Sequence, residues 1–468
     1  MVRRQVGSVD AAWLRMDRPN NLMVIDSVVW FDTPVDWDRL VGVVGRRMVA
    51  RYPVFRQRPI ESWNPLIPPS WEDDPDFRLD RHFIRATLTG PDGHGDKAAL
   101  ERYVERQMHR PFRRDHPLWE MHFVDGVGAG SALVVRVHHS LADGIALGQV
   151  LLSLTDATRT ADLRDTEPDE GIHQPGGRGG LLGVAGALGA FAGSMGADGL
   201  RMLSVAGSLV TPGGLRDALA VTDGAVRASG KLLLHRIPDS PRRGTPGRKK
   251  LATWSEPRKV ADIKRIARLA DATVNDVLVA AVSGAIRTYL LDHGAEPVDL
   301  ATMVPVNLRA PDEELPLELG NRFALVLLSL PTGERTPLLR LEESKHRMDA
   351  IKHSPEATLT FGLLATMGRS GPEVERRLAD FFSAKAIGVT TNVMGPQRRR
   401  YMAGSPIAGV LSWAPGSGNQ TLNVAIFSYN RTVRVGFKAD AKVVPDVEKL
   451  VHAFEAEMDQ FTRLARAA

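Results

Sequence analysis

Two adjacent histidines, His138 and His139, are the residues of this sequence best suited to proton transfer, and Asp143 and Gly144 follow closely. The run before them, Leu133–Val137, is short, largely apolar and rich in valine, which predicts a buried strand. A histidine at the end of a strand is held rigidly, while the loop beyond it keeps it within reach of a substrate. Because imidazole exchanges protons near neutral pH, this position predicts a general acid or base.

Side chains alternate along an extended segment, so His138 and His139 are expected to point to opposite faces. One of them can reach a cavity while the other packs against the sheet. Such a pair chelates a metal poorly, and the sequence contains neither an H-E-x-x-H pattern nor a cysteine, so we expect no metal site. A hydrogen-bonded place in the core is the commoner role of a histidine beside a strand, and the spacing alone leaves that alternative open.

The pattern His-His-x-x-x-Asp-Gly resembles the signature of the acyl-CoA-dependent acyltransferase superfamily, which includes chloramphenicol acetyltransferase and peptide-synthetase condensation domains. Upstream, Arg110–Phe112 and the motif Pro117, Leu118, Trp119 resemble the wax ester synthase/acyl-CoA:diacylglycerol acyltransferase family. The resemblance implies an α/β (α+β) fold of two chloramphenicol acetyltransferase-like domains. Each would be a mixed sheet with flanking helices, and an active-site tunnel would lie at their interface.

The resemblance also implies roles for the residues of the signature. His139 would be the general base that takes a proton from an acceptor hydroxyl. His138 is the second catalytic candidate and is expected to orient the loop. Asp143 and Gly144 would be structural, with the aspartate paired to an arginine. Spacing gives Asp143 a second structural role, because it stands at the N-cap of a helix predicted over Ile145–Leu154.

The segment Thr273–Asp276 has more than one interpretation. Thr273 followed by Asp276 predicts a capping box, in which Asp276 only caps the next helix. The family has an Asn-Asp motif at the corresponding place, so Asn275 is a candidate amide donor to the oxyanion of the tetrahedral intermediate. Spacing supports both interpretations equally. Gly320-Asn321 also resembles the family, with no role implied.

The Pro-Leu-Trp motif predicts architecture rather than proton chemistry. None of its three residues, Pro117, Leu118 and Trp119, titrates. They are therefore candidates for the wall of an acyl channel. The indole of Trp119 either lines such a channel or fills the core.

Composition excludes several other chemistries. The absence of cysteine excludes a thiol nucleophile, a thiolate metal site and a disulfide, and no G-x-S-x-G nucleophile elbow is present. The hydrophobic and charged fractions, 43% and 25%, are ordinary for a globular protein. A net charge of +5 suits an anionic co-substrate or an anionic lipid surface. No basic run is interleaved with aromatic residues, so nucleic acid is not an expected partner.

The chain divides into three parts by composition. We predict an N-terminal acyltransferase domain over residues 1–160, a linker with a glycine- and alanine-rich helical segment over 161–250, and a C-terminal acyltransferase domain over 251–468. The run Leu181–Ala197 is uncharged but slightly shorter than the roughly 20 residues that span a bilayer. We therefore expect Leu181–Val210 to associate peripherally with a membrane or lipid droplet, or to pack on the protein, without spanning.

The resemblance implies an O-acyltransferase that moves a long-chain acyl group from acyl-CoA to a diacylglycerol or a fatty alcohol. Acyl-CoA would be a co-substrate, and no permanently bound cofactor is expected. No apolar run follows Met1–Arg4, which predicts no signal peptide and a cytoplasmic location. Two alternatives stay open: a condensation-type acyltransferase using another thioester or acceptor, and a catalytically idle lipid-binding protein on the same fold.

Overall fold

The computed structural model of the protein describes residues 3–64, 67–90, 95–161, 244–308, 315–352, 360 and 372–467. The segment predicted to associate with lipid, Leu181–Val210, lies outside the described residues. The described part is a mixed α/β structure with two large sheets and helices packed on them, which confirms the predicted fold class.

The first sheet has seven strands. In spatial order they are β5 (Phe83–Thr87), β6 (Trp119–Val127), β7 (Gly130–His138), β2 (Val24–Phe31), β15 (Ser405–Trp413), β14 (Tyr401–Met402) and β8 (Thr155–Asp156). All neighbours are antiparallel except β5 and β6. The predicted strand Leu133–Val137 is confirmed as part of β7, which is buried along its whole length and ends at His138.

Two strands of this sheet, β14 and β15, come from the C-terminal half of the chain. β15 lies antiparallel to β2, with Trp413 opposite Asp26. The hydroxyls of Ser27 and Ser412 hydrogen-bond across this pair at 2.7 Å. The first sheet is therefore built from residues on both sides of the predicted middle segment. The domain limits at residues 160 and 251 stay a prediction.

The second sheet joins strands that follow the middle segment. Its path is β10 (Arg258–Lys259), β17 (Thr432–Asp440), β16 (Leu422–Tyr429) and β13 (Thr390–Met394), and β9 (Lys250–Trp254) also pairs with β17. A separate antiparallel ribbon is formed by β11 (Leu300–Asn307) and β12 (Phe323–Leu330). An isolated bridge from Met303 to Val389 connects this ribbon with the segment that leads into β13. A small sheet of β1 (Arg3–Gln5), β4 (Ser70–Asp73) and β3 (Gln57–Ile60) lies near the N-terminus.

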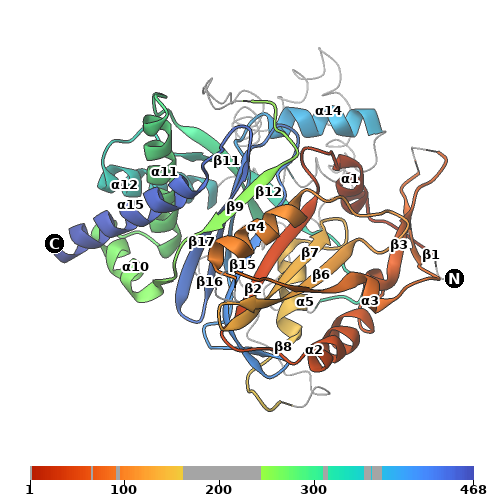
Figure 1. The fold of residues 1–468 in the computed structure, drawn as a ribbon. Helices are drawn as coiled ribbons and strands as arrows, with labels where there is room; N and C mark the ends of the chain where they lie inside the picture. Colours follow the sequence, from red (N-terminus) through yellow and green to blue (C-terminus); the bar gives the residue numbers. More distant parts are fainter. Residues whose placement is uncertain are drawn as a thin grey trace.

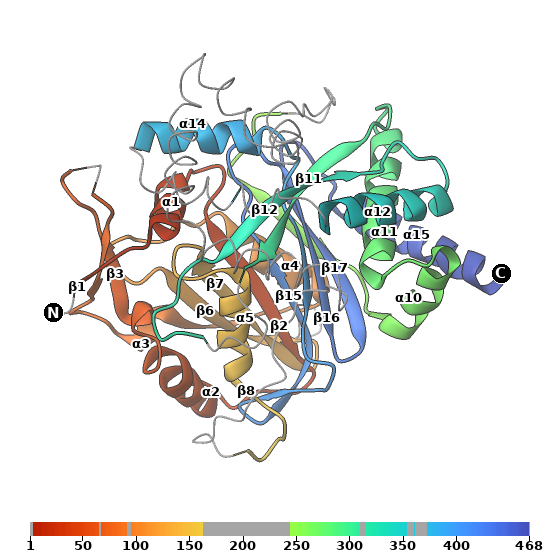
Figure 2. The same cartoon turned by 180° about the vertical axis from the view of Figure 1, so that it is seen from behind.

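Helices cover both halves of the molecule. They are α1 (Ser8–Met16), α2 (Trp37–Val44), α3 (Leu79–His82), α4 (Lys97–Met108), α5 (Gly144–Ser153), α10 (Val260–Ala267), α11 (Val274–Asp292), α12 (Pro337–Lys352), α14 (Pro372–Ser383) and α15 (Glu448–Ala467). Figure 1 shows α10, α11, α12 and α15 gathered at the end of the molecule that carries the C-terminus. From behind, the ribbon β11–β12 extends from these helices toward the first sheet and α1 (Figure 2).

Helix α11 is a core helix. Among the described residues it is the one helix long and apolar enough to cross a membrane. However, 78% of its apolar window is buried inside the protein, where it packs against α10, α12 and α15. Thr273 accepts from the main-chain N–H of Asp276, and Asp276 accepts from that of Thr273, so the predicted capping box is confirmed.

Strand β2 shows how the first sheet uses its two faces. Ile25, Ser27 and Val29 line a cavity on one face. Asp26, which alternates with them, points to the other face and binds Nζ of Lys438 in β17 at 2.7 Å. The first sheet therefore packs on the second sheet through one face and leaves the other face to form the cavity.

Candidate active site

His139 follows the last residue of β7 and lies on the wall of the cavity. Its main-chain N–H donates to the carbonyl of Met23 at 2.7 Å. Its ring stacks on Trp13 of α1 with centroids 4.5 Å apart, and the ring of Phe323 lies 5.3 Å away on a tilted plane. The side chain is only 6% exposed yet lines the cavity. The aromatic contacts therefore fix the position of the His139 ring, and the ring is reached from the cavity.

The hydrogen bonds of Asn321 determine the tautomer of His139. Nδ2 of Asn321 donates to Oδ1 of Asp10 and to the main-chain oxygen of His139, each at 2.7 Å. Both partners accept, so the amide oxygen must be the atom that lies 2.9 Å from Nδ1 of His139. Nδ1 therefore carries the hydrogen, and Nε2 keeps the lone pair that a general base needs.

Burial sets the protonation state of His139. Desolvation lowers the pKa of this imidazole from its ordinary 6.5 to about 4, although the hydrogen bond with Asn321 and the charge of Asp143 act in the opposite direction. The ring is therefore neutral at pH 7. A neutral ring with Nδ1–H can accept a proton at Nε2.

His138 faces away from the cavity, as the alternation of side chains predicts. Its Nδ1 lies 2.8 Å from the hydroxyl of Ser140 and accepts from the N–H of the same residue at 3.2 Å. Its Nε2 lies 3.2 Å from Oδ2 of Asp17. Ser140, His138 and Asp17 have the connectivity of a Ser-His-Asp triad, but Ser140 is 1% exposed and is not among the residues lining the cavity. This arrangement holds the loop.

Asp143 connects the loop to the C-terminal half. Its Oδ1 accepts from the N–H of Ala146, which confirms it as the N-cap of α5. Its Oδ2 accepts from the main-chain N–H of Arg322 at 2.9 Å. The pairing of Asp143 with an arginine side chain, which the family resemblance implies, stays a prediction. Gly144, the first residue of α5, lines the cavity where an added Cβ would meet nothing within 4 Å.

Replacing Asp143 by alanine is expected to lower the free energy of unfolding and the activity together. The variant loses a helix cap, which contributes about 1 kcal/mol, and a part-buried hydrogen bond with the N–H of Arg322, which contributes roughly another 1 kcal/mol. Thermal unfolding and initial rates measure the two effects. Asp143→Asn, which keeps an acceptor oxygen, should lose less. A fully stable but inactive alanine variant would instead indicate direct chemistry at Asp143.

The predicted oxyanion donor, Asn275, is placed outside the cavity. Its Oδ1 accepts from Nδ2 of Asn392 in β13. Thr391 and Val393 line the cavity, so the alternation of β13 places Asn392 on the opposite face. Asn275 is not among the lining residues, and its role as an oxyanion donor stays a prediction. Its neighbour Asp276 caps α11.

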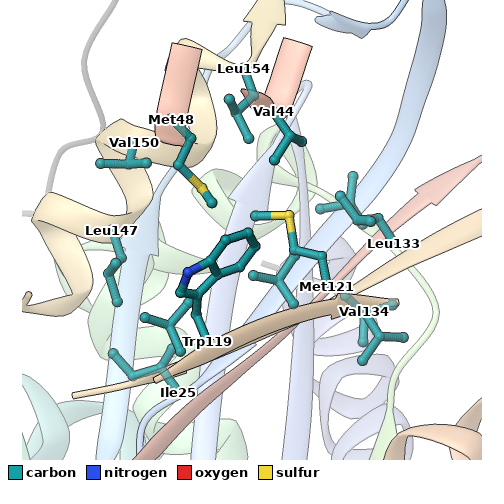
Figure 3. Close-up of a cluster of buried hydrophobic side chains, with 14 of the residues drawn as sticks. Ile25, Val44, Met48, Trp119, Met121, Leu133, Val134, Leu147, Val150 and Leu154 are labelled. Atoms are coloured by element: carbon teal, nitrogen blue, oxygen red, sulfur yellow. The ribbon is translucent and has the colours of Figure 1, made fainter. Parts of the chain in front are cut away.

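The Pro-Leu-Trp motif supports the site from behind. Nε1 of Trp119 donates to the carbonyl of Phe55 at 2.9 Å, and its ring stacks on His82. Trp119 lies among buried aliphatic side chains of the first sheet and α5 (Figure 3). The carbonyl of Leu118 accepts from the N–H of His138 at 2.9 Å. None of the three motif residues is among those lining the cavity, so Trp119 fills the core.

Both halves of the chain line the cavity. Most of the lining is aliphatic, aromatic or methionine side chains. They include Trp13, Ile25, Val29, Met48, Phe55, Met121, Val135, Leu147, Val150, Leu151, Met303, Phe323, Leu325, Val389, Val393, Ile407 and Phe427. An apolar space with a histidine on its wall suits a hydrocarbon chain whose reactive end lies at His139.

Sequence reasoning missed three residues of the site: Asp10, Trp13 and Phe323. It noted Asn321 only as part of a resemblance. A helical signal was present for α1, because Asp10, Trp13 and Asp17 are three and four residues apart and therefore share one helix face. Within the described residues no group of three or more histidine, aspartate or glutamate side chains could hold a metal ion.

A neutral histidine on an apolar cavity between two α/β halves, at the end of a His-His-x-x-x-Asp-Gly strand, defines an acyltransferase with the chloramphenicol acetyltransferase-like fold. The chain belongs to the wax ester synthase/diacylglycerol acyltransferase family. The family model for the catalytic domain matches residues 6–278, and the model for the WS/DGAT C-terminal domain matches residues 319–462. The protein is therefore an acyltransferase enzyme.

Similar proteins cover almost the whole chain. A protein of Mycobacterium tuberculosis named as a probable diacylglycerol O-acyltransferase, tgs1, is 27% identical over 88% of this chain and 84% of its own length. The wax ester synthase/diacylglycerol acyltransferase of Marinobacter aquaeolei VT8 has a TM-score of 0.68 at 20% identity and covers 99% of both chains. The first condensation domain of the calcium-dependent antibiotic synthetase reaches 0.57 at 17% identity over 99% and 96%. These solved structures share the fold.

Proposed function

We propose that this enzyme transfers a long-chain acyl group from acyl-CoA to the hydroxyl of a lipid alcohol, forming triacylglycerol or wax ester. The observation that carries the proposal is that His139, a neutral imidazole with its lone pair on Nε2, lines an apolar cavity in a chain of this family. Acyl-CoA is a co-substrate, and no permanently bound cofactor takes part. A condensation-type acyltransferase has the same histidine pattern but does not account for the match to both family models.

The proposed reaction is a direct transfer between two bound substrates. Nε2 of His139 takes the proton from the acceptor hydroxyl while that oxygen attacks the thioester carbonyl carbon. The tetrahedral intermediate then collapses, the carbon–sulfur bond breaks, and the proton on Nε2 passes to the leaving CoA thiolate. The low basicity of the buried imidazole favours this return of the proton, and Asn321 keeps the hydrogen bond to Nδ1 throughout.

A competition experiment tests the activity. The purified enzyme receives palmitoyl-CoA with equal amounts of hexadecanol and dipalmitoylglycerol, free CoA is followed, and the neutral lipids are separated by chromatography. We expect CoA release that depends on the acceptor, with triacylglycerol as the main product, on the basis of the named relatives. Wax ester as the main product would change the preferred acceptor and leave the mechanism. CoA release only to amines or small alcohols would overturn the proposal.

We further propose a cytoplasmic enzyme that associates peripherally with membranes or lipid droplets, because its acceptors and its acylated products are water-insoluble lipids. Leu181–Val210, with the basic run Arg242–Lys250 after it, is the proposed contact, since each basic residue near an anionic surface contributes about 1 kcal/mol. Flotation with anionic vesicles should decrease when Leu181–Gly196 is replaced by a polar linker. Equal flotation of both proteins would assign the segment to packing.

A further inference from the structure

Helix α1 and the residue that follows it contact both histidines and the side-chain amide of Asn321. Trp13 stacks on the ring of His139. Asp17, the residue that follows the helix, lies beside Nε2 of His138. Asp10, three residues before Trp13, accepts hydrogen bonds from Asn321. The helix therefore supports the catalytic histidine twice, directly through an aromatic ring and indirectly through a carboxylate.

The carboxylate of Asp10 is enclosed. It is 7% exposed, and its Oδ1 accepts from both the main-chain N–H and Nδ2 of Asn321, at 2.9 and 2.7 Å. A Cβ added at Gly7 or Gly320 would stand 2.9 or 3.1 Å from Oδ2, closer than side-chain carbons usually come. The two glycines thus leave room for a carboxylate at this place. No part of the proposed chemistry requires Asp10 to touch a substrate.

The orientation of the Asn321 amide decides whether His139 can act as a base. In the observed orientation the amide oxygen faces Nδ1 of His139, which places the lone pair on Nε2. The reversed amide would donate to Nδ1, so Nε2 would carry the hydrogen and could not accept a proton. Reversal would also turn the amide oxygen toward the carboxylate of Asp10. The acidic side chain therefore opposes the unproductive orientation.

We propose that Asp10 is a positioning residue of this acyltransferase: it fixes the amide of Asn321, which holds His139 in the tautomer with a free Nε2. This proposal rests on the proposed role of His139 as general base. The hydrogen-bond path Asp10–Asn321–His139 joins α1, the segment before β12 and the end of β7, and it crosses between the two halves of the chain.

The pH dependence of the rate gives a readout of this path. Burial raises the pKa of Asp10 to about 7, against the lowering effect of the hydrogen bonds from Asn321 and of the charge of Arg4, while the charge of Asp143 raises it further. The carboxylate ionises across the neutral range, and the ionised form accepts more strongly from Asn321. Activity should therefore rise with pH through about 7. His139, with its pKa near 4, contributes no change there.

The first test replaces Asp10 by asparagine, which keeps an acceptor oxygen of similar size and removes the charge. We expect kcat to fall by about 10–100-fold with the KM for palmitoyl-CoA within about twofold, and the rise near pH 7 to disappear. Asp446→Asn is a matched control. This carboxylate accepts from Tyr289 and lies 3.1 Å from Nε2 of His293, outside the cavity. The control should keep the wild-type pH profile. An Asp10→Asn enzyme with the wild-type kcat and pH profile would overturn the proposal.

A double-mutant cycle separates the proposed path from a general loss of structure. If Asp10 acts only through Asn321, the double variant Asp10→Ala/Asn321→Ala should be no slower than Asn321→Ala alone. Losses that multiply would mean that Asp10 acts independently of Asn321, and the proposal would be wrong. Both comparisons use variants whose unfolding curves show a folded protein.

A measurement without substrate distinguishes failure of this proposal from failure of the proposed function. Nitrogen-15 chemical shifts of the histidine rings report which nitrogen carries the hydrogen, and His139 is assigned by the signal missing from His139→Gln. We expect the Nδ1–H tautomer in the wild type and a mixture in Asp10→Ala. A wild-type protein that transfers no acyl group yet shows this change would keep the positioning role and reject the activity. An unchanged tautomer in Asp10→Ala would reject the positioning role.

Discussion

Replacing His139 by glutamine is expected to lower kcat by about 10²–10⁴-fold, the contribution typical of a general base. Glutamine has an amide of similar reach, but it cannot take a proton from the acceptor hydroxyl. Folding should be kept, because the charged form of His139 is already disfavoured by burial and its ring contributes packing with Trp13 rather than an ion pair. Initial rates with saturating palmitoyl-CoA measure the effect.

Two comparisons make this result specific. Binding of palmitoyl-CoA, followed by calorimetry, should be unchanged, which would separate lost chemistry from lost binding. His293→Gln makes the same exchange at a histidine of the C-terminal half that contacts Asp446, and it should keep the wild-type rate. If His139→Gln retained more than a few per cent of kcat, the assignment of the general base would be wrong.

His138→Ala should have a different signature, in which stability and activity fall together. The substitution removes one partner of Asp17 and the partner of the buried Ser140 hydroxyl. Asp17 keeps its contacts with the N–H of Met23 and with Arg114. The loss therefore comes from the hydrogen bonds of the imidazole, roughly 1–3 kcal/mol, and from the lost ring volume. The loop that carries His139 would then lose its support, so kcat decreases as well.

Urea unfolding of the His138 variant, together with its rate, checks this expectation. Asp17→Asn is the companion variant, because it removes the charge on the other side of the same contact and should show a smaller loss of the same kind. A His138→Ala protein with wild-type stability and no activity would contradict the structural role and point to a second catalytic histidine.

The parts of the site that were predictable from the sequence are those fixed by neighbouring residues. The strand before the histidines, their opposite faces, and the caps formed by Asp143 and Asp276 all follow from patterns within a few residues. Local patterns such as these act through alternation and backbone hydrogen bonds, which need no knowledge of the remaining chain.

The parts that could not be predicted depend on contacts between distant segments. Asn321 and Asp10 are 311 positions apart, and Asn321 and His139 are 182 apart, so no periodicity in the sequence relates them. The surroundings of Asn275 depend on such a contact as well, because its side chain meets Asn392 of β13, 117 positions away. Its role as an oxyanion donor stays a prediction. Packing between distant segments decides which face of a strand is covered by a helix.

The pairing of β15 with β2 has a consequence for how this protein is made. Ser27 and Ser412, which meet across that pair, are 385 positions apart, so the N-terminal sheet has an unfilled edge at β2 until the ribosome has nearly finished the chain. An apolar strand that waits for its partner is exposed to mispairing with other chains, and contacts of such long separation form slowly. The nascent N-terminal half is therefore expected to depend on chaperones during synthesis, and a polypeptide ending before residue 400 should not reach a soluble native state.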